Sequence, residues 1–119
     1  MVEIMTIIRR KHAAATKDEL SRIGCAGYTA FPVLGRGRQR GLRSEPEEGK
    51  GLAFLPKVLL NLVVEDAQVQ ETIEALIRTN QTGQYGDGKI FVIEMTEAYR
   101  ISIGARESAA TTTEEVVAE

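Results

Sequence analysis

Two glycine-rich segments place main-chain amide groups and basic side chains directly beside apolar, strand-like runs. They read GRGRQ at residues 35–39 and GDGK at residues 86–89. Backbone N–H groups exposed in such turns can cradle a phosphate, and an adjacent arginine or lysine adds charge-assisted hydrogen bonds. Taken singly, each segment is better explained as a plain turn, because Asp-Gly is a common hairpin signal. Neither has the spacing of a Walker motif or of GxGxxG, which excludes ordinary P-loop chemistry.

The first segment lies in a long basic loop that runs from residue 33 to residue 57 and reads VLGRGRQRGLRSEPEEGKGLAFLPK. Between its ends the loop carries five cations against three carboxylates, and five glycines give its backbone unusual conformational freedom. A connection this long inside a compact domain is usually a lid, a binding loop or a disordered segment. We therefore expect it to carry function.

The composition limits what this loop can bind. The chain has 119 residues, the length of one domain, and a net charge of −2. Because the whole chain does not attract nucleic acid or an anionic membrane, the basic character of the loop is local. The sequence therefore predicts a small anionic ligand, with no nucleic-acid partner and no direct membrane insertion.

The rare residue types exclude several kinds of site. One cysteine, Cys25, excludes an internal disulfide and a cysteine-rich zinc cluster, and we expect it to be a small, semi-buried apolar residue. One histidine, His12, argues against a histidine-based metal site or a catalytic triad within one chain, and we expect it at the surface. No segment resembles a signal peptide or a membrane-spanning helix, so we expect a cytoplasmic protein.

Apolar periodicity predicts the elements that must position these segments. Alternating residues predict strands, residues spaced three and four apart predict helices, and glycines mark their ends. The expected elements are a strand at 2–9, a helix at 13–23, strands at 28–34 and 57–64, a helix from Asp66 as N-cap to about 80–83, and a strand at 89–94. The order strand, helix, strand, strand, helix, strand predicts an α+β, ferredoxin-like fold in which two helices cover one face of an antiparallel sheet.

Details of the pattern give further expectations. Pro32 predicts that its strand bends or lies at a sheet edge. The strand at 57–64 is apolar on both faces, which predicts self-association over the face that the helices leave open. The apolar stripe of the second helix is expected to consist of Val69, Ile73, Leu76 and Ile77. A single turn at 96–99, a short strand at 100–103 and a disordered tail beyond Gly104 complete the prediction.

Several motifs in this order resemble the PII signal-transduction family. They are IIR at 7–9, the segment 35–41 with its Arg38-Gln39 pair, FLPK at 54–57, the run from Thr82-Gly83 through GDGKIFV, and Arg100. The resemblance covers roughly residues 2 to 104. It implies a ferredoxin-fold domain over 1–104, with the family's T-loop at about 35–56 and a disordered tail at 105–119.

The resemblance also implies ligands and a homotrimeric assembly with three clefts between subunits, each of which binds ATP or ADP. Together with Mg-ATP such a cleft binds 2-oxoglutarate, and the side-chain oxygen of Gln39 helps to hold the Mg ion. The implied nucleotide-binding positions are Ile7, Thr29, Gly35, Gly37, Arg38, Gln39, Gly86, Asp87, Gly88, Lys89 and Arg100. The implied 2-oxoglutarate-binding positions are Gln39, Arg40, Gly41 and Lys57, which suit a dicarboxylate because they offer cations and loop amides.

Within the family, the loop sequence resembles the nitrogenase-linked branch, in particular the second of its paired members. That likeness implies a nitrogenase component protein as partner and a possible hetero-oligomer with a paired paralogue. The implied partner-binding positions are Leu42, Arg43, Ser44, Glu45, Glu47, Glu48 and Lys50. The loop has no tyrosine, so the uridylylation of many family members has no acceptor at its usual place, and Ser102 stands where the family often has a second arginine.

Other functions remain open at this stage. A regulator of an ammonium channel, with the loop tip inserted into the pore, is the alternative within the family. A ferredoxin-like RNA-binding module would need stacking aromatic residues on its central strands, and the strands at 2–9 and 57–64 have none. A small phosphatase-like enzyme would need an organised nucleophile, which the sequence does not indicate. We therefore expect a non-enzymatic sensor.

Overall fold

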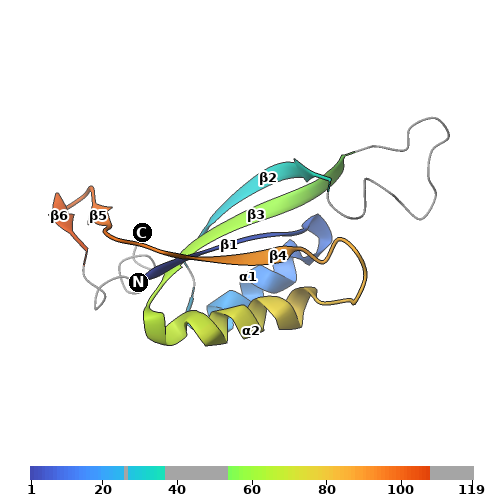
Figure 1. The fold of residues 1–119 in the computed structure, drawn as a ribbon, viewed down its shortest axis with the longest axis horizontal. Helices are drawn as coiled ribbons and strands as arrows, with labels where there is room; N and C mark the ends of the chain where they lie inside the picture. Colours follow the sequence, from blue (N-terminus) through green and yellow to red (C-terminus); the bar gives the residue numbers. More distant parts are fainter. Residues whose placement is uncertain (26, 37–53, 108–119) are drawn as a thin grey trace.

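The computed structural model describes residues 1–25, 27–36 and 54–107. Its elements in chain order are β1 (Val2–Arg9), η1 (Arg10–His12), α1 (Ala13–Arg22), β2 (Thr29–Gly35), β3 (Leu55–Val64), η2 (Asp66–Gln68), α2 (Val69–Asn80), β4 (Lys89–Glu94), β5 (Tyr99–Arg100) and β6 (Ala105–Arg106). Strands β2, β3, β1 and β4 form one antiparallel sheet in that order. Both helices lie on the same side of this sheet (Figure 1). The predicted ferredoxin-like α+β architecture is confirmed.

The core lies between the sheet and the helices. In β1 every second side chain is buried, and Ile4 pairs with Leu62 of β3 in the centre of the sheet. Leu20 of α1 and Leu76 of α2 close the core from the helical side. Alternation therefore predicted the buried face of the central strands correctly. Pro32 lies in β2, an edge strand, as its missing donor predicted.

The buried face of the second helix is shifted from the predicted stripe. Leu76 is buried and Val69 packs against the core as predicted, but Ile77 is 43% exposed, and Thr72, Ala75 and Asn80 are buried instead. The polar residues are accommodated because their side chains find acceptors or donors inside the helix pair: the Thr72 hydroxyl donates to the Gln68 carbonyl.

The start of this helix also differs from the prediction. Asp66 is not the N-cap of α2 but begins the short helix η2, and its side chain makes no cap hydrogen bond. Its carboxylate instead accepts a hydrogen bond of 2.6 Å from the amino group of Met1. The ion pair with Met1 therefore uses the Asp66 carboxylate that was expected to cap the helix.

The segment after β4 was predicted wrongly. Residues 99–106 form a hairpin in which Tyr99 pairs with Arg106 and Arg100 with Ala105, instead of a turn followed by one strand and a tail. Gly104 has a φ of 63°, a left-handed conformation that glycine adopts without strain, and it closes the turn at 101–104. The amide of Glu107 then donates to the Ala98 carbonyl at 2.8 Å. The tail from residue 108 and the loop from 37 to 53 lie outside the described residues.

Two further expectations concern single residues. Cys25 is buried in the core, and burial raises the pKa of its thiol. His12 is half-buried rather than a surface residue, and its Nδ1 atom is buried. Across the described ranges, neither helix has the length and apolar character needed to cross a membrane.

The two helices are joined by an ion cluster around Glu19. Its carboxylate accepts hydrogen bonds from Arg22 on the same helix at 2.5 and 3.0 Å, and from Arg78 of α2 at 2.8 and 2.5 Å. The bonds from Arg22 and then those from Arg78 lower the pKa of Glu19 to about 2. The cluster ties α1 to α2 at their outer surface.

We expect Glu19→Gln to lower the melting temperature by a few degrees, because two guanidinium groups lose their common anion. A carboxylate with a lowered pKa stabilises the fold at neutral pH and loses that effect as the pH falls from about 5 toward 2. The difference between variant and parent should therefore shrink in thermal melts over this range. Asp18→Asn, at the adjacent exposed carboxylate, is the control, and an equal effect of both substitutions would contradict the role of the cluster.

Candidate functional site

The turn between α2 and β4 is built around two glycines. Gly86 and Gly88 have φ values of 98° and 103°, which side-chain-bearing residues rarely adopt. A Cβ atom on Gly88 would lie 2.1 Å from the carbonyl oxygen of Ile7 in β1. Glycine is therefore needed twice over at position 88, for its conformation and for the close approach of the turn to the central strand.

The Asp87 carboxylate holds the turn together from inside. It accepts hydrogen bonds from the Thr82 amide at 2.7 Å, the Thr82 hydroxyl at 2.5 Å and the Gly83 amide at 2.9 Å. Arg9, at the end of β1, donates to it at 2.7 Å. Burial opposes ionisation of Asp87, but the bonds from Thr82, Arg9 and Gly83 outweigh it and keep the pKa well below its usual range. Asp87 is thus an anion at every pH at which such a protein works.

Two neighbouring cations bind main-chain carbonyl groups of the turn. Arg9 also donates to the Tyr85 carbonyl at 2.9 Å, and Lys57 donates to the Gly86 carbonyl at 3.1 Å. The two side chains are directly opposite each other in the β1–β3 ladder. Partial removal from water and the nearby Arg9 lower the pKa of Lys57, while Asp87 acts in the opposite direction. Two cations therefore share one carboxylate at this end of the sheet.

Among the described residues, the amides of Gly86, Asp87 and Gly88 donate no hydrogen bond. Lys89 follows them on an exposed position and lies opposite Ile7 in the β1–β4 ladder. Unaccepted amides beside lysine side chains form the kind of concavity that binds an anion.

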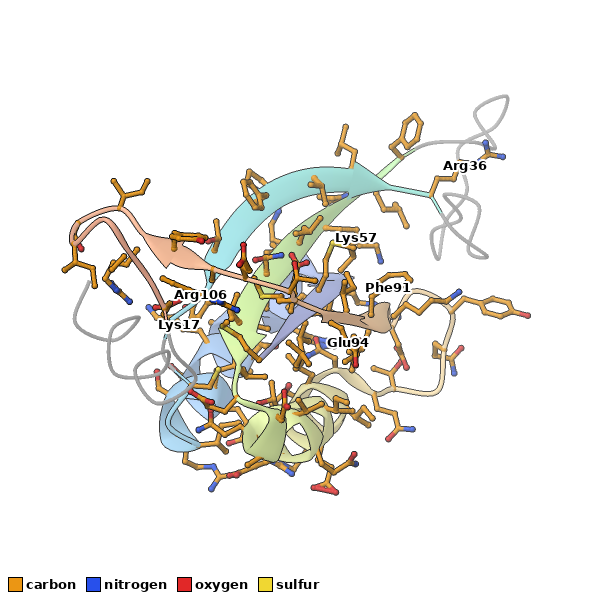
Figure 2. All side chains as sticks on the ribbon, turned by 60° about the vertical axis from the view of Figure 1, so that its left-hand side comes forward. Lys17, Arg36, Lys57, Phe91, Glu94 and Arg106 are labelled. Carbon is orange, nitrogen blue, oxygen red and sulfur yellow. The ribbon has the colours of Figure 1, made fainter. Side chains whose placement is uncertain are left out.

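The end of β2 reaches the same place. A Cβ atom on Gly35 would lie 3.1 Å from Cγ of Lys57, so glycine leaves room for the lysine stem. Figure 2 shows Arg36 at the far end of the β2–β3 ladder, clear of the sheet. The structure therefore brings Gly35, Ile7, Lys57 and the turn at 86–89 together at one end of the sheet.

Two other predicted site residues lie elsewhere in the chain. Arg100 is in β5, beyond the opposite end of β4 (Figure 1), and donates to Glu107 at 2.7 Å with both side chains largely buried. Thr29 is at the start of β2, opposite Asn61 and across the sheet from β4. A single chain does not bring either residue to the glycine turn. The remaining predicted positions, Gly37, Arg38, Gln39, Arg40, Gly41, Leu42, Arg43, Ser44, Glu45, Glu47, Glu48 and Lys50, lie outside the described residues.

Sequence reasoning missed Arg9, Thr82 and Glu107. Thr82 stands five residues before Asp87, within the range of local turn chemistry, and could have been found from that spacing. Arg9 is 78 residues from Asp87, and no local pattern joins the two. Among the described residues there is no group of three or more His, Cys, Asp or Glu side chains that could hold a metal ion. A metal at this site would need ligands from a bound molecule or from residues of the long loop.

Comparison with known proteins agrees with this geometry. The family described as Nitrogen regulatory protein P-II matches residues 1–105. The chain belongs to the P-II family. One relative is a nitrogen fixation nifHD1 region GlnB-like protein 2 from Methanosarcina barkeri, 39% identical over 89% of this chain and 95% of the relative. Another, a nifHD region GlnB-like protein 2 from Methanothermobacter marburgensis, is 40% identical over 89% and 96%. The nitrogen regulatory protein P-II of Rhodospirillum rubrum is 44% identical over 89% and 96%.

Membership in the P-II family indicates the general role of this protein. P-II proteins are regulators rather than enzymes. The likeness to relatives from nitrogen-fixation regions agrees with the nitrogenase-linked branch.

Substitutions at Gly83 and Gly88 separate two effects on stability. One is the cost of a left-handed backbone for a residue with a side chain, and the other is a steric clash with β1. Gly83 has a φ of 84° and open space where a Cβ would lie, so Gly83→Ala is expected to cost roughly 1–2 kcal/mol from the left-handed backbone alone. Gly88→Ala adds a clash with the Ile7 carbonyl and should lose at least twice as much. Urea unfolding of both variants measures the difference, and equal losses would contradict the close packing of the turn on β1.

Proposed function

We propose that this P-II protein senses adenine nucleotides and 2-oxoglutarate in clefts between the subunits of a homotrimer. The observation that carries the proposal is the set of unaccepted turn amides beside Lys57 and Lys89. ATP or ADP would place its phosphates on these amides, because backbone N–H groups and lysines bind phosphate together. Close packing of Gly88 on β1 keeps the turn rigid for this task.

The distribution of the other predicted residues supports a site shared between chains. Arg100 and Thr29 are remote from the turn within one chain, so they would complete the cleft from a neighbouring copy. The face of the sheet opposite the helices supports such an assembly, since many of its side chains are apolar and the helices do not cover it. By their place in the ladders, these apolar side chains are Met5, Ile7, Phe31, Val33, Leu59, Val63, Phe91 and Ile93. Burial of such a face between copies is favourable.

The base of the long loop would hold the effector. Lys57 offers an ammonium group to one carboxylate of 2-oxoglutarate, and the loop positions Arg40 and Gly41 follow the predicted magnesium ligand Gln39. Bound magnesium supplies a hard cation that draws ATP phosphate oxygens and effector oxygens to one centre. The protein's part is to orient Lys57 and the turn amides toward that centre.

The partner we propose is a nitrogenase component protein, controlled through residues 42–50 of the loop. The names of the relatives from nitrogen fixation regions support this choice, and their designation as protein 2 supports a paired paralogue that could join a hetero-oligomer. The ligand would shift the loop only by binding one loop state more tightly than another. A regulator of an ammonium channel is the second candidate, supported by the 44% identity to a P-II protein whose name carries no such region.

Calorimetric titration tests the ligand order. We expect 2-oxoglutarate to bind only when Mg-ATP is present, because the effector needs the metal and phosphates as well as Lys57. Titrations with ADP in place of ATP, and with EDTA added, are the controls. Equal binding of 2-oxoglutarate without nucleotide would exclude the shared metal centre.

Substitutions at the loop base test the residue roles. Gln39→Ala and Lys57→Ala are each expected to weaken 2-oxoglutarate binding by about tenfold or more and ADP binding far less, since a charge-assisted bond contributes about 1.5–3 kcal/mol. Lys17→Ala, at an exposed lysine of α1, is the matched control. Parallel losses for effector and ADP would show that these residues do not serve the effector in particular.

Binding to defined partners separates the two candidate functions. We expect the full chain to retain purified nitrogenase component proteins in a pull-down, and Mg-ATP with 2-oxoglutarate to release them. A variant lacking residues 42–50 should retain neither the nitrogenase component proteins nor an ammonium channel. Retention of a purified ammonium channel in place of nitrogenase would decide for the second candidate.

A further inference from the structure

The hairpin of β5 and β6 contains a buried ion pair between Arg100 and Glu107. The Nη2 atom of Arg100 donates to Oε1 of Glu107 at 2.7 Å, and the two side chains are only 6% and 12% exposed. A second arginine of the same hairpin, Arg106, lies 3.7 Å from Glu97, and these two side chains are 64% and 48% exposed. The hairpin therefore has one exposed ion pair and one that is almost fully removed from water.

The backbone of the hairpin brings Glu107 back to Arg100. Arg100 pairs with Ala105 in the β5–β6 ladder, and Gly104 closes the turn between them. The Glu107 amide donates to the Ala98 carbonyl at 2.8 Å, which fixes the main chain beside the carboxylate. The ion pair thus joins two residues that the fold of the hairpin holds at a set separation.

The proposed function gives Arg100 a second anion, a phosphate of the nucleotide that a neighbouring copy holds at its glycine turn. The Arg100 side chain leaves almost no surface for that phosphate while Glu107 covers it. A carboxylate and a phosphate beside one guanidinium group also repel each other, and more strongly where water is excluded. Because a buried charge without a partner is costly, Arg100 exchanges one anion for the other.

We propose that Glu107 is an internal competitor of the nucleotide: its carboxylate occupies Arg100 in the unliganded chain, and a nucleotide phosphate has to displace it. This inference rests on the proposed function, since it takes Arg100 as the residue that completes the cleft of a neighbouring copy. Glu107 does not touch the ligand. It lowers the affinity of the cleft, so that nucleotide binds only above a higher concentration.

Glu107→Gln tests the proposal by calorimetric titration of the full chain with Mg-ATP. Glutamine has the size of glutamate and keeps an acceptor for Arg100, but it lacks the negative charge. We expect Glu107→Gln to bind ATP roughly fivefold more tightly than the unsubstituted chain, because a neutral hydrogen bond competes less well than a charged one. Unchanged or weaker binding would overturn the proposal.

Glu97→Gln is the matched control for this titration. It removes a carboxylate from the exposed ion pair of the same hairpin and leaves the contact between Arg100 and Glu107 in place. We expect Glu97→Gln to bind ATP as the unsubstituted chain does. An equal gain for Glu97→Gln would show that the charge of the hairpin, and not the partner of Arg100, sets the affinity, and would overturn the proposal.

Thermal melts without nucleotide separate competition from a purely structural role. Loss of a buried ion pair should lower the melting temperature of Glu107→Gln by a few degrees, so this variant is expected to be less stable and yet to bind ATP more tightly. A residue that only holds the hairpin in shape would lose stability and affinity together, which would contradict competition. If Glu107→Gln does not fold, Glu107→Asp takes its place, since a shorter side chain also weakens the bond to Arg100.

A double-mutant cycle shows whether Glu107 acts through Arg100. On the background of Arg100→Gln, the further change Glu107→Gln should no longer tighten ATP binding, whereas a fully retained gain would overturn the proposal. If neither the unsubstituted chain nor Glu107→Gln binds Mg-ATP, the proposed function fails and this inference fails with it. If the unsubstituted chain binds Mg-ATP and Glu107→Gln gains nothing, only the competition fails, so the two failures are distinguishable.

Discussion

The connection from α2 to β4 has to reverse the chain in a few residues, and its polar main-chain groups must still find partners. The Asp87 carboxylate accepts hydrogen bonds from the amides of Thr82 and Gly83, and Arg9 and Lys57 donate hydrogen bonds to two carbonyl groups. These bonds leave the amides at 86–88 without a hydrogen bond among the described residues, and they are the donors that we propose for a bound phosphate.

This arrangement depends on the order of the strands. In the sheet order β2-β3-β1-β4 the central strands are β1 and β3, which places Arg9 opposite Lys57. Two like charges at opposed positions repel each other. The Asp87 carboxylate offsets that repulsion only because Gly88 lets the turn approach β1 closely. The fold thus creates a local excess of positive charge at this end of the sheet.

The same geometry connects the site to the loop. Lys57 is near the start of β3, only three residues after the described chain resumes at residue 54, and Gly35 at the end of β2 lies against its stem. Any molecule that binds at Lys57 is therefore at the root of the long loop. The opposite end of the sheet carries Arg100 in its own hairpin, bound to Glu107. In the cleft that we propose, another copy would supply Arg100, so that ligand binding and assembly would be linked.

The sequence by itself determined the fold class and the place of the glycine turn. Alternation fixed the faces of β1 and β3, Gly24 ended α1, and GDGK marked the turn, because these signals are local and the backbone must obey them. Three things were decided only by the tertiary structure: the face of α2 that buries Thr72 rather than Ile77, the hairpin at 99–106, and the Arg9–Asp87 pair. Each depends on contacts between segments that meet only after folding. Burial, hydrogen-bond partners and charge pairing are properties of the packed chain, so no spacing along the sequence contains them.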